Sequence, residues 1–335
     1  MSFSSLATRI FGWVLLCALL PGCRQEPPPY FAFIDKSGRV RIRLQPAQDA
    51  SSFSEGLAAV SRHGRWGYID ASGAWIIPPR FATVEEFSEG LAVVMTGEYT
   101  SETTRFGFID RTGKFVIAPR FDFASSFSDG VAAVCTGPCR IPKVAGPRPS
   151  YGYINKAGDY VIEGRWEGAG RFSDGRAWVS EMPVLVRGKL VDYDQRTQRL
   201  IDRAGKFVSE ARFRWGMPFS NGLAATDHGY VNRSGDVAMA QPSPDQSFAE
   251  GWAHVIEGGK SVFIDTTGKV VMRPDCLYAE SFSEGLAPAC RNDREYENGW
   301  GYIDRTGKFA IPPQFHHSLG PFRNGLALVC FGCKD

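Results

Sequence analysis

The chain has 335 residues, of which 43% are hydrophobic and 22% charged, and its formal net charge at pH 7 is +2. A chain of this size and composition can bury a large core, whereas a net charge near zero offers little electrostatic attraction for nucleic acid or an anionic membrane surface. We therefore expect a globular protein that does not bind nucleic acid.

The first segment, residues 1–22, has the pattern of an export signal peptide. Its apolar run at 10–20 is too short for a stable membrane span, which needs about 20 apolar residues. The small Gly22 directly before Cys23 resembles a bacterial lipoprotein processing site, so Cys23 is the predicted lipidation site and first mature residue. Cleavage of an ordinary secretory peptide nearby is the alternative.

Residues 23–30 are the predicted lipidated tether between the anchor and the folded domain. The consecutive prolines of this segment favour an extended polyproline conformation. By analogy with lipoprotein sorting, Arg24 after the cysteine indicates the outer membrane. The expected location is therefore the bacterial cell envelope, as an outer-membrane lipoprotein that faces the periplasm and contacts the membrane through its lipid anchor.

Residues 31–335 consist of eight repeat units, each opened by Ile-Asp-x-x-Gly-Lys or a variant of it. In this motif Asp accepts local backbone N–H groups and Gly supplies a positive φ, so the motif predicts a β-hairpin. The turn glycines are Gly38, Gly73, Gly113, Gly158, Gly205, Gly235, Gly268 and Gly307. Three positions before each glycine stands an Asp or Asn, a residue type that serves a turn far more often than catalysis at such a position. These residues are Asp35, Asp70, Asp110, Asn155, Asp202, Asn232, Asp265 and Asp304.

A second motif, Phe-Ser-Glu-Gly-Leu-Ala, recurs once per unit and predicts another strand entered through a glycine turn. Its glycines are Gly56, Gly90, Gly130, Gly175, Gly222, Gly251, Gly285 and Gly325. Their uneven spacing places insertions in loops, and the content of Val, Ile and aromatic residues indicates three or four antiparallel strands per unit. Acidic residues precede most of these glycines, at Glu55, Glu89, Asp129, Asp174, Glu250 and Glu284. We expect them to serve the turns or face solvent, and a cation-binding ring is the alternative.

Three elements recur in fixed order: Trp-Gly-Tyr-Ile-Asp-x-x-Gly, Ile-Pro-Pro-x-Phe and Phe-Ser-Glu-Gly-Leu-Ala. Over about residues 31–331 they resemble the bacterial WG-repeat family, also called KWG repeats. Trp66-Gly67 and Trp300-Gly301 keep the pair that names the family, whereas the fifth and seventh units have lost it at Gln198-Arg199 and Ser261-Val262. The resemblance implies a β-rich repeat scaffold, with no catalytic residues common to the family.

The repeats begin and end out of phase. The first unit opens with the hairpin strand at 31–35 and lacks a preceding strand, while the last strand, at 325–330, lacks a hairpin. In a ring of sheets these two halves complete one unit and remove an exposed edge. We therefore predict an all-β fold of eight tandem antiparallel β-sheet repeats in a closed, propeller-like ring. An open superhelical stack is the alternative.

Two irregular regions interrupt the repeats. They are a Pro/Gly-rich insertion at 135–150 and an extra or lengthened hairpin at 184–194. Both fall between the Gly-Leu-Ala strand and the next hairpin. Because insertions at the same place in a repeat project from one rim, this rim is the predicted binding surface.

Six cysteines remain beyond the signal peptide and the lipid site, and they form local pairs. In an exported protein such pairs predict disulfides rather than free thiols or a metal site. The candidates are Cys135 with Cys139, Cys276 with Cys290, and Cys330 with Cys333. A zinc site from the last pair with His316 and His317 is disfavoured because a second Cys-x-x-Cys is missing, and no metal or cofactor is expected.

The sequence contains no recognisable catalytic motif. The five histidines share no spacing, and a nucleophile elbow, a His-Glu-x-x-His pair and a phosphate loop are all missing. The tryptophans follow the fold repeat, which favours a place between sheets over sugar stacking. We therefore predict no catalytic residue.

The leading functional hypothesis is a non-enzymatic, envelope-anchored scaffold that binds a protein or polysaccharide partner through one rim. It rests on a repeat whose recurring positions all have folding roles, together with a membrane anchor. One alternative is a cell-wall glycan-binding module that uses exposed tryptophans. The other is a hydrolase with its site in a central channel or in the 135–150 loop.

Overall fold

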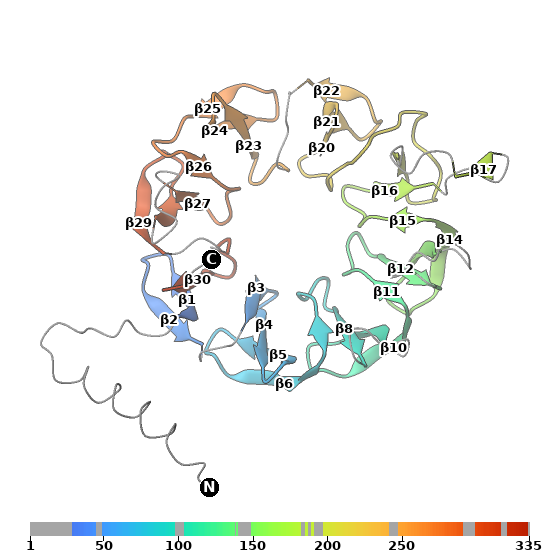
Figure 1. Ribbon diagram of the computed structural model, residues 1–335, viewed down its shortest axis with the longest axis horizontal. Helices are drawn as coiled ribbons and strands as arrows, with labels where there is room; N and C mark the ends of the chain where they lie inside the picture. The colour runs from blue at the N-terminus through green and yellow to red at the C-terminus, as the bar shows by residue number, and fades with distance from the viewer. Residues whose placement is uncertain are drawn as a thin grey trace, which may run out of the picture.

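The protein is a ring of small antiparallel sheets that stand like blades around a common centre (Figure 1). This computed structural model describes residues 29–44, 49–97, 104–137, 139, 149–181, 185–186, 189–190, 197–240, 247–290, 299–315 and 320–333. Within these residues there are eight sheets of three or four strands and one separate two-stranded ribbon. They contain no helix that could cross a membrane. The predicted all-β fold of repeated sheets is confirmed.

We number the blades from the sheet that holds the N-terminal strand. Blade 1 contains β30 (Leu326–Phe331), β1 (Tyr30–Asp35) and β2 (Val40–Arg43). Blade 2 contains β3 (Ala50–Ser54), β4 (Leu57–Arg62), β5 (Arg65–Asp70) and β6 (Trp75–Phe81). Blade 3 contains β7 (Thr83–Val84), β8 (Ala92–Thr96), β9 (Arg105–Ile109) and β10 (Phe115–Phe121). Blade 4 contains β11 (Phe123–Ala124), β12 (Ala132–Thr136), β13 (Ser150–Ile154) and β14 (Tyr160–Trp166).

The second half of the ring is less regular. Blade 5 contains β15 (Gly168–Ala169), β16 (Ala177–Ser180) and β19 (Gln198–Ile201), and the ribbon beside it pairs β17 (Leu185–Val186) with β18 (Lys189–Leu190). Blade 6 contains β20 (Leu223–Thr226), β21 (Gly229–Asn232) and β22 (Val237–Met239). Blade 7 contains β23 (Trp252–Glu257), β24 (Lys260–Asp265) and β25 (Val270–Met272). Blade 8 contains β26 (Tyr278–Ala279), β27 (Ala287–Cys290), β28 (Trp300–Ile303) and β29 (Phe309–Phe315).

The two ends of the repeat array meet in blade 1. Strands β1 and β30 pair antiparallel over six residues each, from Tyr30 opposite Phe331 to Asp35 opposite Leu326. The chain thereby gives the first hairpin its missing strand, and no edge remains where the array begins and ends. The predicted pairing of the two terminal segments is confirmed.

Each hairpin turn is held by its own aspartate or asparagine. In blade 3 the Thr112 hydroxyl donates to the Asp110 carboxylate (2.6 Å), as do the backbone N–H groups of Thr112 (2.9 Å) and Lys114 (3.1 Å). These bonds, with that of the Thr112 hydroxyl foremost, hold the pKa of Asp110 below its ordinary value. Asn155 accepts the same two backbone bonds in blade 4, so the position needs an oxygen rather than a charge.

The glycine of the Trp-Gly pair lets the outermost strand cross tightly over its neighbour. A Cβ atom added at Gly107 would lie 2.7 Å from the Ile117 carbonyl oxygen and 2.8 Å from the Pro119 nitrogen. Both are backbone atoms of β10, which cannot move aside as a side chain would. The Trp-Gly and Ile-Pro-Pro elements therefore recur together because each is the packing partner of the other.

The core lies between blades, where two repeat motifs meet. The hairpin aromatic of one blade packs against the phenylalanine of the Phe-Ser-Glu-Gly motif in the next blade, with ring centroids 4.7 to 5.0 Å apart. These pairs are Phe33–Phe53, Tyr68–Phe87, Phe108–Phe127, Tyr153–Phe172, Tyr230–Phe248, Phe263–Phe282 and Tyr302–Phe322. A blade alone would leave these rings exposed, so the blades stabilise one another.

Seven of the residues before the second-motif glycines link their blade to the next. Glu89 adopts a left-handed φ of 54°, and its carboxylate accepts the backbone N–H of Gly130 in the following blade (3.0 Å). We call this position the clasp. The side chains that accept a glycine N–H of the next blade in this way, at 2.7 to 3.3 Å, are those of Glu55, Glu89, Asp129, Asp174, Glu250, Glu284 and Asn324. The bond from Asn324 reaches Gly56 and so crosses the closure of the ring.

A basic residue of the following hairpin completes the clasp. Lys156 lies 3.2 Å from Glu89, and the same ion pair recurs as Lys36–Glu284, Arg203–Asp129 and Arg305–Glu250. The basic residue always follows the turn Asp or Asn. Where the clasp residue is the neutral Asn221 or Asn324, the corresponding hairpin position of the next blade holds Thr266 or Ala71. An acidic clasp residue thus faces a basic hairpin residue of the next blade, and a neutral clasp residue faces a neutral one.

Candidate binding surface

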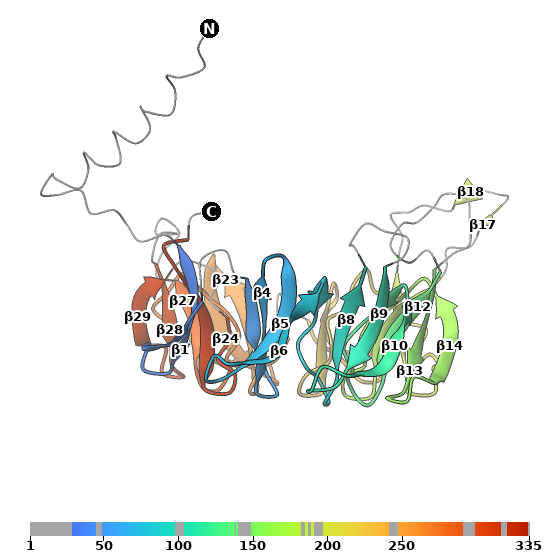
Figure 2. The ribbon, with the colours of Figure 1, turned by 90° about the horizontal axis from the view of Figure 1, so that it is seen from below.

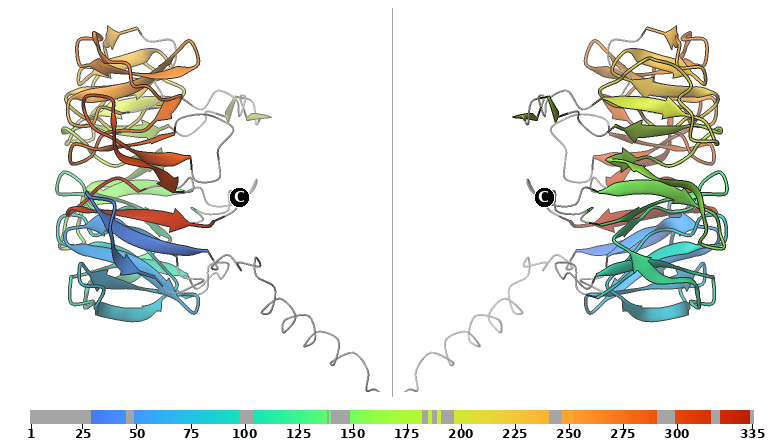
Figure 3. Two further views of the ribbon diagram at one scale, coloured as in Figure 1. Left: turned by 90° about the vertical axis from the view of Figure 1, so that its left-hand side faces the viewer. Right: turned by 90° about the vertical axis from the view of Figure 1, so that its right-hand side faces the viewer.

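The ring has two unlike faces, which Figure 2 shows at its lower and upper sides. The turn face carries the hairpin turns, such as 110–113, and the clasp turns, such as 88–91. The insertion face carries the opposite strand ends, including those that join β12 to β13. Figure 3 shows the ring edge-on, with the ribbon β17–β18 standing off the insertion face.

The long connections within blades leave the insertion face. In blade 2 only two residues, His63 and Gly64, join β4 to β5. By contrast, the connections β8 to β9, β12 to β13, β16 to β19 and β27 to β28 span 8, 13, 17 and 9 residues. The regions predicted at 135–150 and 184–194 both belong to this set, and β17–β18 confirms the extra hairpin. Residues 138, 140–148, 182–184, 187–188 and 191–196 lie outside the described residues.

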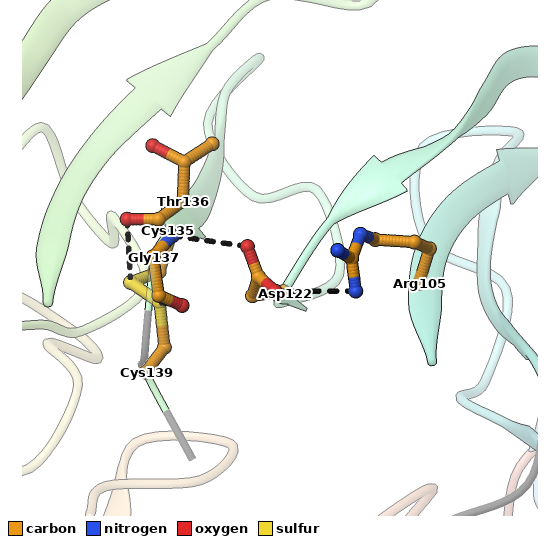
Figure 4. The surroundings of a disulfide bond; sticks show 6 residues. All are labelled: Arg105, Asp122, Cys135, Thr136, Gly137 and Cys139. Atoms are coloured by element: carbon orange, nitrogen blue, oxygen red, sulfur yellow. Dashed lines mark hydrogen bonds and ion pairs between the residues drawn. A yellow bond between two sulfur atoms is a disulfide. The ribbon is translucent and has the colours of Figure 1, made fainter. Parts of the chain in front are cut away.

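A disulfide stiffens the insertion face at blade 4 (Figure 4). Cys135, at the end of β12, is bonded to Cys139, with their Cα atoms 6.3 Å apart. Between them the backbone N–H of Gly137 donates to Asp122 (2.9 Å), and Asp122 forms an ion pair with Arg105 of blade 3 (3.4 Å). The start of the insertion is therefore tied both to itself and to the neighbouring blade.

Aromatic side chains line the same region. The ring centroids of Phe106 and Phe123 are 6.1 Å apart, and those of Phe123 and Tyr151 are 5.7 Å apart. Phe123 and Tyr151 are half-buried, and burial raises the pKa of Tyr151. Half-buried aromatic rings beside fixed polar groups are typical of protein and carbohydrate interfaces.

The remaining predicted cysteines differ in outcome. Cys330, within β30, forms a disulfide with Cys333, with a Cα separation of 5.9 Å. No disulfide joins Cys276 to Cys290, which corrects the prediction of a third one. The reason is their placement: Cys276 packs in the core between blades 7 and 8, whereas Cys290 packs in the core between blades 8 and 1. Burial raises the pKa of the Cys276 thiol to about 12. Cys23 lies outside the described residues.

The carboxylates, tryptophans and histidines considered in the sequence analysis have the following positions in the fold. The clasp carboxylates are bound as described above, and the described residues contain no group of three or more His, Cys, Asp or Glu that could hold a metal ion. Of the tryptophans, Trp166, Trp178 and Trp300 are buried, and only Trp215 is more than a third exposed among those described. The buried His254 bonds to the Ser261 hydroxyl (3.1 Å). His316 and His317 lie outside the described residues.

A cluster of polar side chains lies near the inner strands, where the hydrolase alternative would place a site in a central channel. Glu85 follows β7, the inner strand of blade 3 (Figure 1). Its carboxylate accepts the backbone N–H of Ser126 (2.9 Å) and bonds to the Ser126 hydroxyl and to Arg171 (3.1 Å). Residues of the two following blades therefore hold this carboxylate in place.

One pocket was not predicted from the sequence. It lies between blades 4 and 5, has a volume of about 560 Å³, and is lined by Arg165, Trp166, Glu181, Gly205, Lys206 and Phe207. The signal that could have found it is the loss of the Trp-Gly pair at Gln198-Arg199. That substitution puts an arginine where four other blades have the packing glycine.

A ring of eight antiparallel sheets that is closed by its terminal strands is a β-propeller, and its tandem repeats place it in the class of scaffolds and binding modules. The family model described as WG containing repeat matches residues 48–66, 66–99, 106–137, 151–181, 199–226, 263–294 and 300–332. These segments make up more than half of the chain, so the chain belongs to the WG containing repeat family. The unmatched stretch 227–262 contains the seventh unit's lost Trp-Gly pair.

Solved structures show only distant likeness. The chain is similar to a eukaryotic initiation factor with 11% identity over 87% of this chain and 97% of that chain, at a TM-score of 0.46. It is similar to AztD from Citrobacter koseri with 12% identity over 92% and 98% of the two chains, at a TM-score of 0.44. Neither likeness carries an argument about binding. No curated protein gave a match.

Proposed function

We propose that this protein is a non-enzymatic scaffold, anchored in the bacterial envelope through lipidated Cys23, that binds a protein or polysaccharide partner with its insertion face. One observation supports the proposal most. The clasp residues and turn aspartates of the turn face are engaged in bonds within the ring, whereas the longest connections and the ribbon β17–β18 leave the opposite face. A face with variable connections on a rigid ring suits recognition.

The proposal assigns no catalytic residue and no cofactor. The recurring polar and aromatic residues of the repeat serve cohesion between blades, which leaves them unavailable for chemistry. The blade 4 disulfide and the Asp122–Arg105 pair would reduce the loss of conformational entropy when a partner binds.

Photo-crosslinking from the two faces tests the proposal for a protein partner. Thr136 is exposed on the insertion face and Lys114 is exposed on the turn face. With a photo-crosslinking amino acid at either position, we expect a discrete adduct in cells from position 136 only. The adduct should be competed away by untagged protein. Equal adducts from both positions, or adducts from position 114 alone, would contradict the insertion face as the binding surface.

A polysaccharide partner is tested by co-sedimentation of the purified protein with peptidoglycan sacculi. Polyethylene glycol attached at Thr136→Cys should block sedimentation, and the same label at Lys114→Cys should leave it intact. If neither face yields an adduct and the protein stays in the supernatant, the scaffold proposal is wrong.

The anchor is tested separately at Cys23. A Cys23→Ala variant exported with a cleavable signal peptide should leave the membrane fraction while keeping its thermal melting curve. The lipoprotein assignment fails if this variant still sediments with membranes in high salt.

A further inference from the structure

The pocket between blades 4 and 5 lies beside the one described blade in which an arginine replaces the packing glycine. Arg199 occupies the place that Gly107 has in blade 3, since Val179 faces Arg199 as Val94 faces Gly107. The outer segment 207–213 corresponds to β10. It pairs with β19 through isolated bridges of Phe207 to Ile201 and Phe213 to Gln198, with a further backbone bond from Val208 N–H to the Leu200 carbonyl oxygen (2.9 Å), and does not form a continuous strand. The Arg199 side chain lies against this segment, where it contacts Ser209, Glu210 and Phe207.

The positively charged side chain of Arg199 is buried. It is 5% exposed, its Nη1 lies 3.3 Å from Glu181, and its Nη2 lies 3.1 Å from both Glu210 and the Ser209 carbonyl oxygen. Its guanidinium stacks on Phe207 at 3.6 Å, and its buried Nε has no hydrogen-bond partner. A buried charge with an unsatisfied donor costs stability, so its presence points to a use other than folding.

The side chains around the pocket carry positive charge, which favours an anionic ligand. Arg165 and Lys206 line it, and Arg199 contacts two of its lining residues, Glu181 and Phe207. The one acidic lining residue, Glu181, is already neutralised by Arg199 and by Arg212 at 2.7 Å. Arg165 stacks over Trp166, and its Nη2 donates to the Gly205 carbonyl oxygen, so two contacts hold its guanidinium at the edge of the pocket.

We propose that this pocket binds a small anionic molecule through its carboxylate or phosphate oxygens, with Arg165 and Lys206 as direct partners and Arg199 as the buried charge that fixes the site. The volume lies within the range of about 300 to 1,000 Å³ usual for small-molecule sites. Planar guanidinium groups suit both kinds of oxyanion. The lining residues come from β14 of blade 4, from the hairpin turn and outer segment of blade 5, and from Glu181, which directly follows β16.

The test is titration calorimetry of the folded domain with inorganic phosphate, citrate and neutral glucose as probes. We expect saturable binding of phosphate or citrate, and the anion that binds identifies the class. Lys206→Glu should weaken binding by at least about tenfold, the usual effect of losing a charged hydrogen-bond partner. Lys206 is exposed, so this variant should keep its melting curve.

The matched control is Lys114→Glu. Lys114 has the same place in the blade 3 hairpin, where Gly107 keeps the outer strand packed, and this variant should bind like the wild type. The proposal is overturned if neither anion binds at millimolar concentration. It is also overturned if Lys114→Glu weakens binding as much as Lys206→Glu, or if glucose alone binds.

Discussion

Substituting Gly107 by alanine tests the packing that defines this repeat. The added Cβ would lie 2.7 Å from the Ile117 carbonyl oxygen, 2.8 Å from the Pro119 nitrogen and 3.0 Å from the Pro119 Cα. A Cβ normally stays about 3.4 Å or more from such atoms. Since all three are backbone atoms, β10 has to shift outward as a unit or detach.

The expected loss follows from what β10 buries. Ile117 is 3% exposed and Phe121 is 1% exposed. A local shift that strains a packed core costs about 1 to 3 kcal/mol. Full detachment would lose about 1.5 to 3 kcal/mol for each of the two side chains. We therefore expect Gly107→Ala to lower the free energy of unfolding by about 3 kcal/mol, which is about 6 °C in melting temperature at about 2 °C per kcal/mol for a chain of this size.

Thermal melts and hydrogen exchange measure the effect, with Gly168→Ala as the control. A Cβ at Gly168 meets nothing closer than the Ser180 hydroxyl oxygen at 3.4 Å, so this variant should stay within about 1 kcal/mol of the wild type. The reasoning is refuted if Gly107→Ala melts within about 1 °C of the wild type and the amide protection of segment 115–121 is unchanged.

Three further predictions concern closure, clasps and acid stability. Deleting residues 326–333 should abolish amide protection at Ala32–Ile34, about 290 residues away in the chain, whereas unchanged protection there would argue against closure by β30. Lys156→Glu should destabilise the ring by up to about 1 kcal/mol in urea titrations, and adding Glu89→Lys should restore part of the loss; no coupling in this double-mutant cycle would contradict the clasp. Because the folded-state pKa of Asp110 is lowered, its carboxylate contributes stability above its unfolded pKa near 4, and this contribution is lost as the pH falls through the folded value. Asp110→Asn should therefore keep the turn at pH 7 and reduce the acid dependence of melting, and an unchanged pH profile would count against this role.

The turn chemistry could be predicted from the sequence because it is local. Asp110 bonds to residues two and four positions away, so the motif alone contains both partners. The number of sheets and the closure of the ring were also predictable. The first hairpin and the last strand were each half of a unit, and an exposed strand edge is costly for a soluble protein.

The hydrogen-bond and ion-pair partners that lie in different blades could not be predicted from the sequence. The clasp from Glu89 to Gly130 and Lys156 joins residues 41 and 67 positions apart, and the repeat pattern does not say how many units separate two such partners. The same limit explains the error on the cysteines. Cys276 and Cys290 look like a local pair, yet the strands of blade 8 present them to different blade interfaces.

The sequence by itself determined the hairpins, the repeat number and the ring, since these depend on contacts within one unit and on the phase of its two ends. Only the tertiary structure decided which blade each carboxylate bonds, and that blade 5 accommodates an arginine at the glycine position beside a pocket. The physical reason is that Arg199 is tolerated only where Glu181, Glu210 and Phe207 converge on it, and that convergence arises when the blades pack.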